Sequence, residues 1–284
     1  MTSSTVRVAA VQLSSGSNTE ENIERALAGV ASAVSSGATY VQLPEYFNYR
    51  GPTSRYHDVA EDIPGPTTAR LAEVARNNNI TLHAGSMLER SPDPSKSYNT
   101  SVVFAPSGDI VATYRKGHLF DINVPGEVEQ YESRNIAPGD RLVISDAPGF
   151  ALGLSVCFDL RFTEMYRRLS SHGATVLAVP SSFAVATGRV HWEVLLRARA
   201  IENHAYVIAA AQAGTTTEGL SSFGHSMIIG PWGEVLAESD VDGEDVLIAT
   251  IDTREVDRRR SQIAVLALQR PDLYRSLPVP GGDD

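Results

Sequence analysis

The chain has 284 residues, which is enough for one large domain or two small ones. Its 34 acidic and 24 basic residues give a formal net charge of −10, and this argues against a nucleic-acid-binding surface, which must neutralise phosphate charge. The single cysteine excludes an internal disulfide framework and a cysteine-cluster zinc site.

The N-terminal segment has an arginine inside its apolar stretch and no long apolar run, so it does not resemble a signal peptide. No apolar run approaches the roughly 20 residues of a membrane helix. We therefore expect a cytoplasmic protein with no membrane partner.

Strand-like and helix-like patterns alternate along the chain. Asn18, with Glu21 three residues later, predicts a helix N-cap, and apolar residues then recur on one helical face. This rhythm predicts an α/β fold with helices packed on buried strands. The predicted strands are 6–13, 40–43, 81–87, 101–105, 110–114, 151–158, 175–180, 205–212 and 226–230, and the further helices are 66–77, 162–171 and 192–203.

Two segments predict similar hairpins. Residues 106–112 read PSGDIVA and residues 231–237 read PWGEVLA, and each follows an apolar strand with Pro-x-Gly at the turn. The repetition suggests two sheets, each covered on its outside by helices. Residues 118–140 form the longest stretch without periodicity and are expected to be a functional loop. The tail, 271–284, is expected to be extended.

Three polar residues share a position at the ends of predicted strands. Glu45 follows 40–43, Lys116 follows 110–114, and Cys157, the only cysteine, ends the strand that begins at 151. Ligands of such sheets bind beyond the carboxyl ends of the strands, so these side chains could face one pocket.

A carboxylate, an ammonium and a thiol together suit acyl transfer from an amide. The carboxylate can accept the thiol proton, and the ammonium can stabilise a thiolate and an oxyanion. The backbone N–H of Phe158 could be a second oxyanion donor. Each residue also has an ordinary interpretation: a buried cysteine is usually a small core side chain, and strand-end Glu and Lys are usually solvated.

The segments LPEYFN, YRKGHLFD and LSVCFDLRF resemble the three signature segments of the nitrilase superfamily of carbon–nitrogen hydrolases. Further segments, among them YNTSVVFAPSG, VPGEVEQYES, GHSMIIGPWGEVLAE and RPDLY, are similar to the branch that holds ω-amidase and deaminated glutathione amidase, so the resemblance covers nearly the whole chain. It implies a four-layer α-β-β-α sandwich, formed by a single domain at 1–270. It also implies a homodimer or higher homo-oligomer, with 271–284 at the interface.

The resemblance also assigns roles to particular residues. Glu45 matches the general base, Lys116 the oxyanion-stabilising lysine and Cys157 the nucleophile. Glu132 matches a second glutamate, which positions the lysine and the substrate. For the substrate, Arg161 matches an arginine that binds a carboxylate and Thr187 a residue lining the site; these two join Phe158 as expected substrate-binding residues. Asp159 is expected to orient the turn after the nucleophile.

We therefore expect a cysteine-dependent amidase that hydrolyses the ω-carboxamide of a small 2-oxo acid such as 2-oxoglutaramate, through a thioester, without metal or other cofactor. The first half of the sequence looks closer to ω-amidase, and the second half leans toward deaminated glutathione amidase, which is the main alternative. Another aliphatic amidase, a true nitrilase and a non-enzymatic α/β protein are further alternatives.

Overall fold

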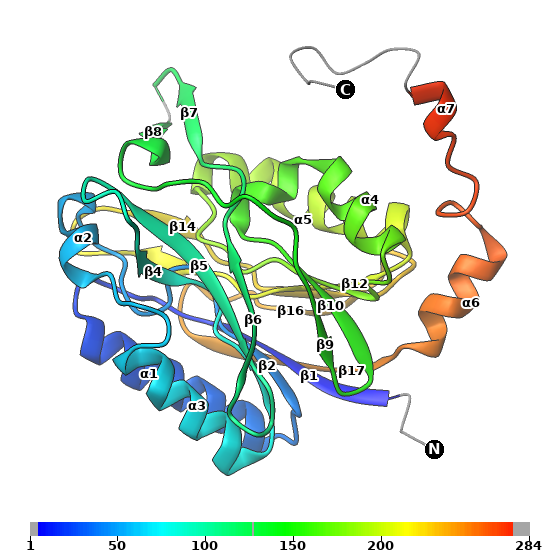
Figure 1. Ribbon diagram of the computed structural model, residues 1–284, viewed down its shortest axis with the longest axis horizontal. Coiled ribbons are helices and arrows are strands. Elements are labelled where there is room, and N and C mark those ends of the chain that lie inside the picture. Colours follow the sequence, from blue (N-terminus) through cyan, green and yellow to red (C-terminus); the bar gives the residue numbers. More distant parts are fainter. Residues whose placement is uncertain (1–4, 127, 275–284) are drawn as a thin grey trace.

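Two sheets face each other in the computed structural model, which describes residues 5–126 and 128–274 (Figure 1). The first sheet has the order β17 (Asp245–Asp252), β1 (Thr5–Gln12), β2 (Tyr40–Gln42), β3 (Thr81–His83), β5 (Ser97–Phe104), β4 (Met87–Arg90), and β6 (Ile110–Arg115) also pairs with β5. The second has the order β16 (Val235–Glu238), β15 (Met227–Ile229), β12 (Tyr206–Ala209), β11 (Val176–Ala178), β10 (Phe150–Leu154), β9 (Ile144–Ala147).

Helices cover the outer face of each sheet. Helices α1 (Thr19–Ser35) and α3 (Pro66–Asn78) lie on the first sheet, and α4 (Thr163–Ser171) and α5 (Val185–Asn203) lie on the second (Figure 1). Asn18 caps α1 by accepting a hydrogen bond from the N–H of Glu21, as the sequence predicts. The shorter elements are η1 (Thr53–Arg55), α2 (Tyr56–Val59), β7 (Asp121–Val124), β8 (Val128–Tyr131), η2 (Glu132–Arg134), η3 (Cys157–Arg161), β13 (Ala213–Thr215), β14 (Ser221–Phe223), α6 (Arg254–Gln262) and α7 (Pro271–Tyr274).

Strand β1 shows how the layers are built. Val8 and Ala10 point into the core between the sheets, while Ala9 and Val11 pack in a second core with α1 and α3. Successive strand residues point to opposite faces, so a strand buried on both sides reads as a continuous apolar run. The two cores confirm the predicted four-layer α-β-β-α sandwich.

Both predicted hairpins are present and resemble each other in detail. Strand β5 pairs antiparallel with β6, and β15 with β16, and each pair has a register shift near the turn. Gly108 and Gly233 have nearly the same positive φ, 85° and 86°, a conformation that glycine adopts readily. The two-sheet layout suggested by these repeats is therefore confirmed.

Several predicted element boundaries were wrong, and three of them have identifiable reasons. Strand 81–87 stops at His83, because Gly85 turns the chain at φ 58° so close to Pro44 that a Cβ would lie 2.0 Å from its carbonyl oxygen. Helix 192–203 begins seven residues earlier, at Val185. Thr187 and Gly188 are weak helix formers, which is why the pattern did not predict a helix there. Gly188 packs directly against Phe223, and this tertiary contact outweighs the low helix propensity of the segment.

The third boundary concerns the strand predicted at 151–158. It ends at Leu154, and the nucleophile candidate begins η3 instead.

Two predicted irregular segments contain structure. The stretch 118–140 holds the β7–β8 hairpin and η2, whose pairing the lack of apolar periodicity concealed. Residues 271–274 of the tail form α7 rather than extended chain, and the rest of the tail lies outside the described residues. No helix in the described ranges has the length and apolar character needed to cross a membrane.

Candidate active site

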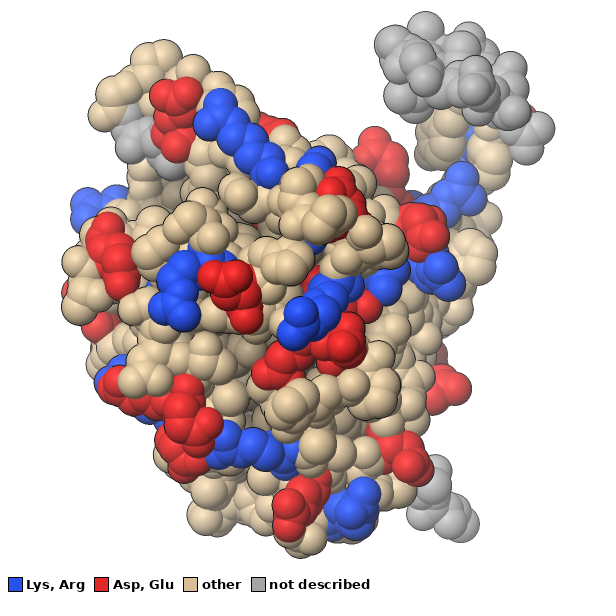
Figure 2. Space-filling view, turned by 60° about the vertical axis from the view of Figure 1, so that its left-hand side comes forward, with Lys and Arg blue, Asp and Glu red and all other residues tan. Residues whose placement is uncertain are grey.

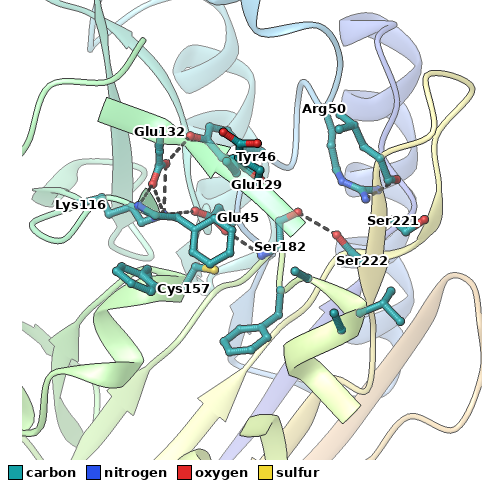
Figure 3. A pocket seen from close by; sticks show the side chains of 18 of the residues that line it. Glu45, Tyr46, Arg50, Lys116, Glu129, Glu132, Cys157, Ser182, Ser221 and Ser222 are labelled. Carbon is teal, nitrogen blue, oxygen red and sulfur yellow. Dashed lines mark hydrogen bonds and ion pairs between the residues drawn. The ribbon is translucent and has the colours of Figure 1, made fainter. Parts of the chain in front are cut away.

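The carboxyl ends of parallel strands from both sheets meet at one edge of the sandwich. Strands β2 and β10 each pair in parallel with their neighbours, β2 with β1 and β3, and β10 with β11. Glu45 follows β2 and Cys157 follows β10, while Lys116 directly follows β6. The chain thus brings the three predicted residues together, as strand-end placement predicts (Figure 3).

A buried lysine lies between two glutamates. The Nζ of Lys116 is 3.0 Å from Oε1 of Glu45, and 2.8 Å and 3.1 Å from the two carboxylate oxygens of Glu132. All three side chains are buried. A buried charge is stable only when it is paired and hydrogen-bonded, so this cluster fixes the ammonium in one place.

The two carboxylates are held by further donors. Glu132 accepts hydrogen bonds from the hydroxyl of Tyr46 at 2.8 Å and from the N–H of Phe120 at 2.7 Å. Glu45 accepts one from the side-chain amide of Asn99 at 2.9 Å and one from the N–H of Ser182 at 2.7 Å. These bonds leave little freedom to either glutamate.

The backbone around Cys157 is unusual, and its largely buried side chain lines the cavity. Cys157 has φ 47°, a left-handed conformation that is rare for a residue other than glycine, and its N–H donates to the Pro180 carbonyl at 2.9 Å. The next N–H, of Phe158, is hydrogen-bonded to no acceptor in the described chain. It is therefore available to an oxyanion, together with Lys116.

The carboxylate of Asp159 holds this turn in place through hydrogen bonds, as the sequence predicts. Its fully buried carboxylate accepts hydrogen bonds from the N–H of Val156 at 2.8 Å and from the hydroxyl of Tyr114 at 2.7 Å. It also accepts one from the N–H of His118 at 3.0 Å. Asp159 therefore ties η3 to the segment that carries Lys116.

Burial and charge set the resting protonation states. Burial alone would lower the pKa of the Lys116 ammonium, but the carboxylates of Glu132 and Glu45 outweigh it and raise that pKa well above its usual value. Burial, followed by the Glu45 carboxylate, raises the pKa of the Cys157 thiol more than Lys116 lowers it. The resting site thus contains a charged lysine and a neutral thiol next to a carboxylate that can accept its proton.

A cavity of about 480 Å³ opens onto these groups. Glu45, Lys116, Cys157, Glu132 and Phe158 all line it. Arg161 and Thr187 do not: the Arg161 guanidinium lies near the rings of Phe158 and Phe183, which line the cavity, and the Thr187 hydroxyl bonds to the Ala184 carbonyl. The described residues contain no group of three or more His, Cys, Asp or Glu side chains placed to hold a metal ion.

Sequence reasoning missed Tyr46, Asn99, Ser182 and Arg50. Tyr46 and Asn99 stand inside segments that carry the family resemblance, which was the only available signal. Ser182 acts through its backbone, 137 residues from Glu45, and no side-chain pattern reports such a contact. Arg50 lines the cavity from the loop after β2.

The carbon–nitrogen hydrolase family model matches residues 7–261. The chain is 40% identical over 268 residues to human omega-amidase NIT2, which covers 94% of this chain and 96% of that protein. It is also 40% identical over 271 residues to mouse omega-amidase NIT2, with 95% and 97% covered.

Two solved structures have the same fold. The Caenorhabditis elegans NitFhit protein superposes with a TM-score of 0.90 at 36% identity, covering 96% of this chain and 67% of that one. Saccharomyces cerevisiae Nit3, described as a member of branch 10 of the nitrilase superfamily, gives a TM-score of 0.84 at 29% identity, covering 96% and 98%.

Proposed function

Since the chain belongs to the carbon–nitrogen hydrolase family and is a hydrolase of amides, we propose that it is an ω-amidase. Its substrate is the ω-carboxamide of a small 2-oxo acid, such as 2-oxoglutaramate, and its products are the dicarboxylate and ammonia. The observation that carries the proposal is one cavity lined by Glu45, Lys116, Glu132 and Cys157, in a chain whose relatives of nearly equal length are named omega-amidases.

The first half-reaction forms a thioester. The sulfur of Cys157, neutral at rest, attacks the amide carbon while its proton passes to Glu45. The carbonyl oxygen becomes an oxyanion between Lys116 and the N–H of Phe158. Glu45 then returns the proton to the leaving nitrogen, the carbon–nitrogen bond breaks, and ammonia departs.

The second half-reaction uses the same groups on water. Glu45 takes a proton from water as the water oxygen attacks the thioester carbon, and the proton returns to the sulfur when the carbon–sulfur bond breaks. Glu132 holds the Lys116 ammonium in place through both steps by its two short contacts. No step needs a metal or organic cofactor.

Arg161 and Thr187 are proposed to contact the far end of the acyl group. The Arg161 guanidinium forms no ion pair with any described residue. It lies near the rings of Phe158 and Phe183 beside the cavity and near the ring of His191. A guanidinium in that setting suits a carboxylate through paired hydrogen bonds. Thr187 lies near the start of α5 and could supply a further contact.

The test is ammonia release from a panel of amides, measured with a chelator present. The panel holds 2-oxoglutaramate, glutamine and a neutral aliphatic amide. We expect the highest kcat/KM for 2-oxoglutaramate, because the 2-ammonium of glutamine would bring an unpaired charge to a site built for a 2-oxo group.

Preference for glutamine would refute the ω-amidase proposal. Deaminated glutathione and a nitrile are tested beside the panel to distinguish the alternatives. Faster release of 2-oxoglutarate from deaminated glutathione, whose cleavage frees an amine instead of ammonia, would favour that amidase, and ammonia from nitriles but not amides would indicate a true nitrilase. Activity only after a metal is restored would contradict the cofactor-free mechanism.

A further inference from the structure

Arg50 stands on the wall of the catalytic cavity opposite the nucleophile. It lies in the loop between β2 and η1 and is only 5% exposed, yet it lines the cavity. Figure 3 shows its side chain beside Ser221 and Ser222, across from the cluster of Lys116, Glu132 and Glu45. The cavity therefore has Lys116, paired with two glutamates, at one end and Arg50 at the other.

The Arg50 guanidinium has no acidic partner among the described residues. Its one side-chain hydrogen bond there goes to the Leu220 carbonyl at 2.7 Å. A guanidinium has five N–H donors, and a buried cation is costly unless it is paired. Burial lowers the pKa of Arg50 to about 10, which leaves the side chain charged at neutral pH.

Several arginines elsewhere in the molecule are matched by acids. Arg70 pairs with Glu20 and Glu24, and Arg115 pairs with Glu89. On the face drawn in Figure 2, basic and acidic side chains lie next to one another in the same way. An unmatched guanidinium inside the catalytic cavity is therefore a feature of this site that the catalytic cluster does not explain.

Polar groups connect this wall to the reacting centre. The Ser182 N–H donates to Glu45, and the Ser182 hydroxyl is 2.9 Å from the Ser222 hydroxyl, which lines the cavity next to Arg50 (Figure 3). A substrate bonded to Cys157 can thus extend past Glu45 along hydroxyl groups to the guanidinium. Glu129 of β8, the acid on this cavity outside the catalytic cluster, makes no ion pair with Arg50.

We propose that Arg50, with the Ser221–Ser222 edge, forms an anion subsite that binds a carboxylate of the substrate. This inference rests on the proposed function, since it assumes that an amide is cleaved at Cys157. The carboxylate can come from the acyl part of the amide or from the amine part. Arg161 is already assigned to the acyl end, and the ammonia released from 2-oxoglutaramate carries no carboxylate, so an amine-side carboxylate at Arg50 would extend the substrates to N-substituted amides whose leaving group is an acidic amine.

The first experiment compares three amides in matched variants. 2-Oxoglutaramate carries an acyl carboxylate, N-butanoylglycine carries one on the amine side, and butanamide carries none. Arg50→Gln should lower kcat/KM for at least one acidic amide by about tenfold or more relative to butanamide, as expected for losing a charged hydrogen bond. Arg50→Lys keeps the positive charge but not the planar guanidinium, so it should lower kcat/KM for that amide less than Arg50→Gln does.

The control is Arg55→Gln, which removes a positive charge from an exposed arginine of the neighbouring η1 that does not line the cavity. It should not change the ratio between acidic and neutral amides. A selective loss on 2-oxoglutaramate would locate the acyl carboxylate at Arg50, and one on N-butanoylglycine would locate the amine-side carboxylate there. An equal decrease in kcat/KM for all three amides, or no decrease, would overturn the proposal. Arg50 would then serve only to hold the backbone at Leu220.

A second experiment does not depend on turnover. Alkylation of Cys157 by iodoacetamide is followed with and without 2-oxoglutarate, a dicarboxylate, or butanamide as protectant. Arg50→Gln should raise the concentration of 2-oxoglutarate needed for half-protection by about tenfold, and that of butanamide far less. If no 2-oxo acid amide is hydrolysed but this selective shift remains, the proposed function fails and the anion subsite stands. Equal shifts for both protectants would refute the subsite.

Discussion

Cys157 occupies a backbone conformation that costs of order 1–3 kcal/mol and persists only where the surroundings impose it. The surroundings here are the Pro180 carbonyl, which accepts its N–H, and the Asp159 carboxylate, which holds the preceding N–H. The strain turns the sulfur into the cavity and leaves the N–H of Phe158 without a partner in the described chain. At the scale of single residues, the turn at Cys157 is thus fixed through its backbone N–H groups.

Cys157→Ala should abolish amide hydrolysis while leaving the fold intact. Alanine keeps the backbone contacts but removes the nucleophile, and we expect kcat to fall by at least about 10³-fold. Ammonia release and thermal melting of the purified variant check both parts. Lys116→Ala should be nearly as damaging, and the double variant should be no worse than the worse single one. Substantial turnover by Cys157→Ala would exclude this residue as the nucleophile.

Glu45→Gln should separate proton transfer from nucleophilicity. Without Glu45 the leaving nitrogen has no proton donor, so ammonia release should fall by at least about 10²-fold. After burial, Glu45 is the main cause that raises the pKa of the Cys157 thiol, while Lys116 lowers it. The glutamine variant should therefore have a lower thiol pKa and be alkylated by iodoacetamide at pH 7 at least as fast as the wild type. Parallel loss of both reactivities would contradict the assigned role.

Arg161→Lys should depress kcat/KM for 2-oxoglutaramate selectively. Lysine keeps the charge but loses the planar fork, and a lost charged hydrogen bond costs about 1.5–3 kcal/mol, or about one to two decades in rate constant. A neutral aliphatic amide should be affected far less. The same decrease for both substrates would show that Arg161 only supports Phe158 and Phe183.

The sequence was informative about those residues whose side-chain chemistry follows directly from their position. Glu45, Lys116 and Cys157 were candidates from their strand-end positions and were chosen through the family resemblance, whereas Glu132 was found through the resemblance alone. Glu132 lies in a segment with other acids. Only the hydrogen bonds from the Phe120 N–H and the Tyr46 hydroxyl in the folded structure distinguish it from them. Arg50 was not found, because an arginine before Gly-Pro reads as an exposed turn residue until burial is known.

Secondary-structure elements were predictable where apolar periodicity is strong. The strands β1, β2, β6 and β15 and the helices α1 and α3 lie close to their predicted positions. The β7–β8 hairpin was not predicted, because its pairing is local and its residues are largely exposed, so no buried stripe marks it. This hairpin nevertheless supplies Glu129 and Gln130 to the cavity wall. The expectation of a loop at 118–140 was therefore wrong about its structure, while its functional role stays a prediction.

Strand β3 carries a histidine that should make stability depend on pH. Burial lowers the pKa of His83 to about 3, and its ring lies between the hydroxyls of Tyr40 and Ser101. In the unfolded chain the His83 ring is protonated as the pH falls through about 6.5. In the folded chain the ring is protonated only near pH 3. The free energy of unfolding should therefore fall as the pH drops below about 6.5, by about 2 kcal/mol at pH 5.

The check is denaturant unfolding of wild type and His83→Gln at pH 7.5 and pH 5. The variant lacks the titrating ring, so its stability should drop less between the two pH values, by about the same 2 kcal/mol. An identical pH dependence in both proteins would mean that His83 does not remain neutral in the fold.

At the scale of the whole molecule, one outer face is more apolar than a solvated surface requires. Helix α5 exposes Val190, Val194 and Ile201 on one side, and the turn between β15 and β16 exposes Trp232. The turn lies against the helix, since a Cβ on Gly233 would be 2.6 Å from the Ile201 side chain. We call these four residues the α5 face. Contiguous exposed apolar side chains of this kind mark association surfaces.

We therefore predict that the protein is at least a dimer, with the α5 face of one copy against that of another. A symmetric interface of this kind uses the same patch twice, so one charge introduced on the face appears twice in the contact and should be strongly disruptive. Light scattering at micromolar concentration should give at least twice the 30.5 kDa mass of the chain. Val194→Glu should shift it toward the monomer, whereas Val111→Glu, at an exposed valine of β6 outside this face, should not. A monomer mass for the wild type would refute the prediction, and a dimer unaffected by Val194→Glu would place the interface elsewhere.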